Sequence, residues 1–184
     1  MSPLGRLLRN RRADEGRAAW HLPHLQSARQ LTLTSEDFGD GGTMPRESWA
    51  KSVGGADRSP RLSWSPPPAG TVQLLLVVED IDVPLRTPAV HCVALIDPAV
   101  RALDPGALDA RGPAGGVRPL RSTVGRGYHG PAPIKGHGPH RYVFQLFALS
   151  APAERAVTAR PRAFLSAVPA AVLARGRLTG IHER

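Results

Sequence analysis

The chain has 184 residues, the length of one ordinary domain, and its hydrophobic fraction of 41% is enough for a buried core. Nineteen glycines and nineteen prolines favour short strands joined by many turns over a helical bundle. The single cysteine, Cys92, excludes a framework of internal disulfides. The sequence shows neither an apolar run of membrane-spanning length nor a signal-peptide pattern, so we expect a soluble, cytoplasmic protein. No motif in the sequence indicates a cofactor.

The net charge of +9 is concentrated at the two ends of the chain. Residues 1–30 hold six arginines against two acidic residues, residues 151–184 again hold six against two, and the middle of the chain carries only +1. A body this close to neutral argues against nucleic acid as a partner. The arginine excess is equally typical of an electrostatic function and of the mutational bias of a GC-rich genome.

Residues 1–30 are interpreted as a basic N-terminal extension, followed by one domain over residues 31–184. Leu4, Leu7 and Leu8 stand among arginines and indicate one short amphipathic helix, which glycine weakens. Such a helix is typical of a weak anchor on an anionic or membrane surface. The alternative is a loosely ordered tail that packs Trp20 or Leu22 on the body.

From residue 31 onward the pattern changes to short apolar runs separated by turn residues. The expected strands are residues 31–38, 62–64, 71–82, 89–97 and 141–150. Strands at these separations with irregular links predict a mostly β protein, an antiparallel β-sandwich with Greek-key-like connections. In the tail, residues 160–180, apolar residues recur at helical spacing, so we expect short C-terminal helices with a kink or a new start at Pro169.

Ionisable side chains stand at or near one end of each of the three strongest strands. Residues two apart share a face of a strand, which places Asp80 and Asp82 beyond the apolar face of residues 71–82. The same rule puts His140 and Tyr142 on one face. It puts His91 on the face of Ala89, Val93 and Leu95, opposite Cys92.

If these strands are neighbours, their polar ends converge on one small pocket at the edge of the sheet. Two carboxylates, two imidazoles and a phenol suit an anion that carries hydroxyl or amine groups. The turn over residues 127–136 could add backbone N–H donors. His129 and His137 lie in loops and are expected to be solvated.

Other interpretations of the same residues remain open. His91, His140 and either Asp80 or Asp82 match zinc or iron ligand types, although no tight metal-binding spacing accompanies them. A lone histidine on an apolar strand is often only a hydrogen-bonded core residue. Nucleophilic catalysis lacks an activated serine, and Cys92 is best explained as a small buried residue.

Four sequence blocks and the chain's ending resemble the phosphatidylethanolamine-binding protein family, specifically its bacterial Raf kinase inhibitor-like branch. The blocks are "SPRLSWSPPPAGT", "VVEDIDVP", "VHCVALID" and "GYHGPAPIKGHGPHRYVFQLFAL", and the ending is "LTGIHER". The resemblance runs from about Leu31 to the end of the chain. It implies a sandwich of two antiparallel sheets with C-terminal helices and a small pocket for phosphate, acetate or a phosphorylethanolamine-like head group.

Carried onto this sequence, the resemblance implies a ligand-binding pocket and a cis peptide before Pro84. The pocket residues would be Asp80, Asp82, His91, Gly130, Pro131, Ala132, Pro133, His140 and Tyr142. The chain departs from the family pattern at Ile81, Val83, Cys92, Ala132, Ile134 and His182. The ionisable pocket residues are thus kept while residues that shape the pocket differ.

These observations favour a non-enzymatic binding protein with no catalytic residues and no metal. The expected partner is a small anion or phospholipid head group, with a weak membrane-surface contact and a homodimer through an exposed sheet face as further options. One alternative is a modulator of a protein kinase or serine protease that acts through surface loops such as residues 98–127. Another is a hydrolase that uses His91 or His140 as general base.

Overall fold

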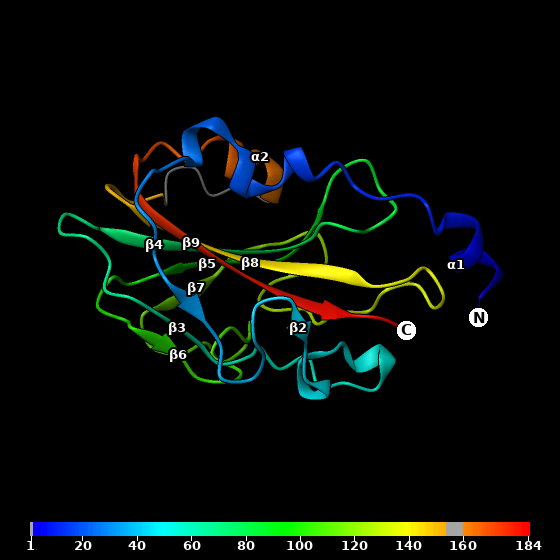
Figure 1. Ribbon diagram of the computed structural model, residues 1–184. Coiled ribbons are helices and arrows are strands. Elements are labelled where there is room, and N and C mark those ends of the chain that lie inside the picture. The colour runs from blue at the N-terminus through cyan, green and yellow to red at the C-terminus, as the bar shows by residue number, and fades with distance from the viewer. Residues whose placement is uncertain (1, 154–159) are drawn as a thin grey trace.

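Two β-sheets form the body of the protein in the computed structural model, which describes residues 2–153 and 160–184 (Figure 1). Within that part of the chain, a six-stranded sheet has the order β2-β9-β8-β4-β5-β7 and a three-stranded sheet the order β1-β3-β6. Neighbouring strands are antiparallel except β2 and β9, which are parallel. The predicted antiparallel sandwich is confirmed.

The strands differ greatly in length. The longer ones are β4 (Gln73–Asp80), β5 (Ala89–Ile96), β8 (His140–Leu149) and β9 (Val172–His182). The short ones are β1 (Leu33–Thr34), β2 (Gly42–Thr43), β3 (Leu62–Trp64), β6 (Ala102–Leu103) and β7 (Val117–Pro119). Two one-to-two-turn helices, α1 (Pro3–Leu8) and α2 (Pro161–Ser166), flank the sheets.

The main core lies between the two sheets. Leu62 and Trp64 project from the small sheet, and Leu76, Phe144 and Leu146 project from the large one into the same buried cluster. Burying this much apolar side-chain surface is the dominant favourable term in folding. The core therefore fixes the large sheet from one side.

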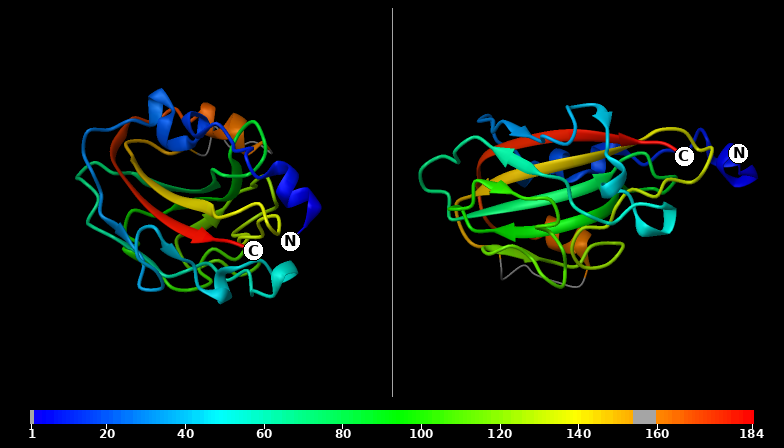
Figure 2. Two further views of the ribbon diagram at one scale, coloured as in Figure 1. Left: turned by 45° about the vertical axis from the view of Figure 1, so that its right-hand side comes forward. Right: turned by 90° about the horizontal axis from the view of Figure 1, so that it is seen from below.

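The outer face of the large sheet is covered by the N-terminal segment and α2, which lie together above the sheet (Figures 1 and 2). Leu25 from that segment and Phe164 from α2 share a second buried cluster with Phe147 of β8. Trp20 packs on the same cluster, and the guanidinium of Arg175 lies 3.9 Å from the centre of its ring. Residues 19–25 thus pack tightly on the body, with Trp20 at the contact.

A buried carboxylate ties these layers together. Glu79 of β4 is fully buried, and its Oε2 accepts hydrogen bonds from the backbone N–H of Ala19 at 2.7 Å and the side-chain amide of Gln145 at 2.8 Å. Its Oε1 lies 2.6 Å from a guanidinium nitrogen of Arg162 in α2. A charge buried this deeply is tolerated only when it is paired and hydrogen-bonded, as here.

The expectation of helices throughout residues 160–180 is wrong beyond Ser166. The chain instead forms β9, in which burial alternates from Ala174 to His182 and every second residue faces the core. Pairing with β8 along almost its whole length outweighs the local helical spacing. Gly176 and Gly180 fit this strand because Leu31 and Met44 approach their backbone so closely that a side chain would collide with them.

We predict that Glu79→Ala lowers the free energy of unfolding by about 3–5 kcal/mol, because Arg162 would be left without its buried partner. Urea denaturation followed by tryptophan fluorescence measures this change. Glu36→Ala is the matched control, since Glu36 pairs with Arg61 at 3.5 Å on the surface. Its expected cost is below about 1 kcal/mol. Equal costs for the two variants would contradict the structural role of Glu79.

Candidate functional site

A cavity of about 490 Å³ opens at the end of the large sheet where β4 ends and where β5 and β8 begin. Antiparallel pairing brings the end of β4 beside the starts of its two neighbours, so residues distant in sequence meet there. The cavity is lined by Asp80, His91, His129, Ala132, Pro133, His140 and Tyr142, among others. Most of the predicted pocket residues are therefore brought together.

A β-bulge in β5 places His91 in this cavity. Cys92 pairs with Val78, whereas the next residue of β4, Glu79, pairs with Val90, so His91 is the extra residue. Simple alternation had put His91 on the face of Val93 and Leu95, which instead belong to the outer cluster. The bulge turns the imidazole to the side of Asp80 and Tyr142.

The ring of His91 is held in one orientation. Its Nδ1 lies 2.9 Å from the carbonyl oxygen of His129, and a carbonyl only accepts, so Nδ1 carries the proton. The ring meets Tyr142 edge-on with centroids 5.2 Å apart. Burial lowers the pKa of His91, against the opposing effects of the His129 hydrogen bond and the Asp80 charge. His91 is therefore neutral near pH 7, with Nε2 left for a ligand.

A chain of three buried side chains runs along the cavity wall. His140 Nδ1 lies 2.7 Å from Asp80 Oδ2, and His140 Nε2 lies 2.7 Å from His137 Nδ1. His137 Nε2 in turn lies 3.1 Å from the carbonyl oxygen of Arg11. Both ring nitrogens of His140 are thus occupied by the protein itself.

His137 is a residue that sequence reasoning placed wrongly, since it is completely buried and not solvated. Burial, together with the charges of Arg12 and His140, lowers the pKa of His137. A guanidinium nitrogen of Arg12 lies 2.9 Å from His137 Nε2, so Arg12 also contacts this end of the chain. At the other end, His140 Nδ1 faces the Asp80 carboxylate. The three side chains are thus held by contacts within the protein.

Tyr142 contributes a buried hydroxyl to the lining of the cavity. It is buried between the rings of His91 and His140, and among the described residues its hydroxyl has no hydrogen-bond partner. Burial, followed by the charge and the polar contact of the Asp80 carboxylate, raises the pKa of Tyr142 well above its usual value. The hydroxyl therefore stays protonated and lies near Asp80 without a hydrogen bond of ordinary geometry, which leaves it able to donate to a further acceptor.

Asp82 does not line the cavity, although the sequence grouped it with Asp80. Arg141 donates to its two oxygens at 2.8 and 3.0 Å, and Arg12 approaches at 3.3 Å. Burial alone would raise the pKa of Asp82, but the hydrogen bonds and charge of Arg141, with the charge of Arg12, lower it. Asp82 joins the N-terminal segment to the start of β8.

The turn over residues 130–133 forms another wall of the cavity. Gly130 is packed against the backbone of residues 48–50, where a side chain would collide. Its N–H donates to Asp57 Oδ1 at 2.8 Å, and the Pro131 carbonyl accepts from Ala50 at 3.0 Å. Ala132 and Pro133 line the cavity, and Pro131 does not. Backbone donors of the turn are thus partly engaged within the protein.

Three further features differ from the sequence analysis or were absent from it. No cis peptide bond occurs in the described part of the chain, so the expected cis peptide before Pro84 is wrong. Asp57 lines the cavity with a left-handed backbone (φ 53°), a conformation that aspartate tolerates, but nothing in its sequence surroundings signalled this role. Arg12 was not singled out because its partners, Asp82 and His137, lie far away in sequence.

The structure is thus a sandwich with a cavity at one end that is lined by polar groups and apolar side chains, the type of concave site that small-molecule sites generally have. The model of the family described as phosphatidylethanolamine-binding protein matches residues 34–183. The chain belongs to that family, whose members are generally binding proteins and not enzymes.

Individual relatives agree with this membership. A UPF0098 protein of Mycobacterium tuberculosis is 34% identical over 165 residues, which cover 88% of this chain and 75% of that protein. The structure of YbcL from Escherichia coli superposes with a TM-score of 0.73 at 26% identity, covering 84% of this chain and 99% of YbcL. The homologue from Chlamydia trachomatis gives 0.70 at 26% identity, covering 85% and 99%.

His182, which stands where the family pattern has tyrosine, is a buried histidine at the end of β9. Its ring stacks on Trp49 with centroids 4.1 Å apart and is 3% exposed. Burial, then the charges of Arg184 and His140, lowers the pKa of His182 to about 4. Because the unfolded chain binds the proton more tightly, the stability from this residue is present above about pH 6.5 and is lost as the pH falls toward 4.

We predict that His182→Phe, which keeps the ring stacked on Trp49, reduces the loss of stability at low pH. Between pH 7 and about pH 4 the wild type should lose on the order of 2 kcal/mol more unfolding free energy than the variant. Urea melts at several pH values measure the difference. His21→Phe, at an exposed histidine, is the control and should follow the wild type. Identical pH profiles for wild type and His182→Phe would refute the assignment.

Proposed function

We propose that the protein is a non-enzymatic binding protein whose cavity holds a small anion, such as phosphate or a phosphorylethanolamine-like head group. The observation that carries the proposal is the buried, protonated Tyr142 hydroxyl, which makes no hydrogen bond of ordinary geometry among the described residues, beside the ring of His91, whose Nδ1 alone is bonded to the protein. An anion oxygen would accept from Tyr142 directly. It would accept from His91 only after Nε2 has taken up a proton.

Two features support binding without covalent chemistry. Burial raises the pKa of Cys92 to about 12, so its thiol stays protonated and unreactive. His140, a candidate general base, already uses both ring nitrogens within the protein. The Asp80–His140–His137 chain acts instead as a rigid wall that keeps the cavity open and polar.

Ligand affinity should fall as the pH rises from about 5.5 to 8, because His91 must bind a proton to donate to the anion. Sulfate is the probe of choice for calorimetric titration, since its own charge is constant over this range. At the upper end the loss should approach about tenfold per pH unit. His91→Gln, which offers an uncharged N–H donor, should bind with little pH dependence. A flat profile for the wild type would contradict the role of His91.

The two tyrosines of the chain provide a matched pair. Tyr142→Phe should weaken binding of phosphorylethanolamine about tenfold and cost little stability, because in the described part of the chain its hydroxyl has a polar contact with Asp80 but no hydrogen bond of ordinary geometry. Tyr128→Phe should leave binding unchanged and cost about 1 kcal/mol of stability, because Tyr128 donates to the Ser48 carbonyl at 3.1 Å. Ligand titration and urea denaturation of both variants test this. Unchanged affinity in Tyr142→Phe would remove the main support for the proposed site.

A further inference from the structure

Exposed large hydrophobic side chains gather around the mouth of the cavity. Among the described residues five such side chains are exposed: Leu4, Leu7, Val72, Leu85 and Val124. Leu85 and Val124 line the cavity, and Leu4 and Leu7 belong to α1. A single exposed leucine means little, but four of five at one site mark an interaction surface.

Helix α1 is seated beside the cavity. Gly5 is buried against the backbone of Lys135 to His137, so closely that a side chain there would collide with it. Ile134, the residue before that stretch, lines the cavity. Figures 1 and 2 show α1 at the end of the molecule where the loop before β8 projects. Leu4 and Leu7, three residues apart on one side of the helix, are 53% and 80% exposed.

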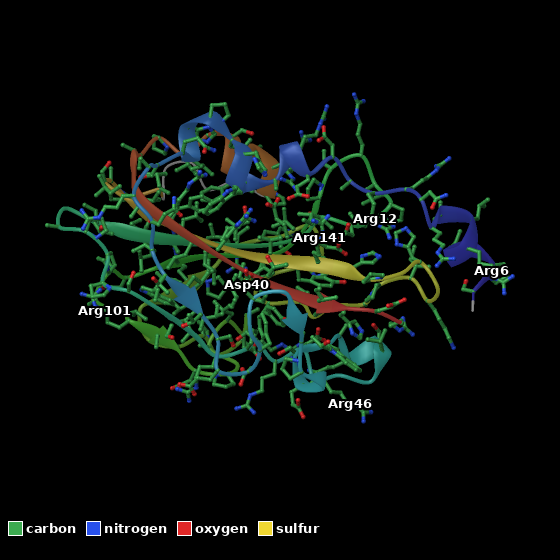
Figure 3. The ribbon with its side chains drawn as sticks, viewed as in Figure 1. Arg6, Arg12, Asp40, Arg46, Arg101 and Arg141 are labelled. Carbon is green, nitrogen blue, oxygen red and sulfur yellow. The ribbon has the colours of Figure 1, made fainter. Side chains whose placement is uncertain are left out.

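Arg12 fixes this segment beside the cavity. Its guanidinium lies 3.3 Å from Asp82 and within 3.1 Å of both ring nitrogens of His137. Figure 3 shows Arg12 on the stretch of chain between α1 and the sheets. The N–H of Asp14 donates to the carbonyl of Arg86, which follows Leu85. The exposed leucines of α1 are thus held in position relative to the apolar rim.

The charge around this surface is positive. Residues 1–12 contain four arginines and no acidic residue. Arg6, Arg9 and Arg11 are exposed, as are Arg86 and Lys135 on the two loops that flank the cavity. Leucines at the centre of exposed arginines and lysines are typical of surfaces that insert into the head-group region of an anionic bilayer.

We propose that this end of the molecule, formed by α1 and the rim residues Leu85 and Val124, docks onto an anionic phospholipid bilayer with the cavity mouth facing the head groups. This inference rests on the proposed function, because it names the bilayer as the source of the head group that the cavity would bind. The leucine side chains would enter the head-group region of the bilayer, and the arginine side chains would neutralise the negative charge of the anionic lipids.

The test is binding of the full chain to large vesicles by co-sedimentation. Vesicles of phosphatidylcholine alone are compared with an equal mixture of phosphatidylcholine and phosphatidylglycerol. The wild type should bind the mixture and bind phosphatidylcholine at least about tenfold more weakly, and high salt should reduce the difference. Leu7→Ser should lower the affinity for the mixture by about tenfold.

Val72→Ser is the matched control, because Val72 is the one exposed large hydrophobic residue of the five that belongs neither to α1 nor to the lining of the cavity. It should bind vesicles like the wild type. Equal losses for Leu7→Ser and Val72→Ser, or no binding of wild type to the mixed vesicles, would overturn the docking surface. Binding to neutral and anionic vesicles alike would overturn the role of the arginines.

Failure of this inference is distinguishable from failure of the proposed function. Sulfate titration of Leu7→Ser reports on the cavity alone, and it should match the wild type because Leu7 does not line the cavity. If sulfate binds but vesicles do not, the cavity stands and the docking surface is wrong. If vesicles bind in a Leu7-dependent manner but sulfate does not, the docking surface stands without the anion site.

Discussion

Alternation of side chains along β4 is the constraint on which the rest of the structure depends. One set of side chains, ending at Asp80, faces the other sheet and the cavity, while the other set, ending at Glu79, faces the outer layer. Because the two carboxylates are neighbours in sequence, a single strand end supports the cavity on one side and the attachment of Ala19 and Arg162 on the other. Neither side can shift in register without disturbing both.

The strands with dense apolar residues could be predicted from the sequence, because burial on both faces leaves few alternatives for such segments. The cavity could be predicted in outline because Asp80, His140 and Tyr142 obey simple alternation. His91 does not, since its position depends on a bulge that is defined only by pairing with β4. The convergence of the strand ends correctly included His91 in the cavity, whereas the face that alternation assigned to it was wrong.

Two other differences have the same origin in long-range contacts. The tail after residue 166 has apolar spacing compatible with either a helix or a strand, and only the presence of β8 beside it decides for β9. His137 stands in a loop rich in glycine and proline, where exposure is the usual outcome. Its burial requires Arg12 from the beginning of the chain, a contact that no local pattern contains.

The outer layer also sets an order of events during synthesis on the ribosome. Residues 19–25 are made early, but their partners Gln145, Leu165 and Arg175 are made much later. The early segment must therefore wait, without these partners, until most of the chain has emerged, and it closes over a sheet that is already formed.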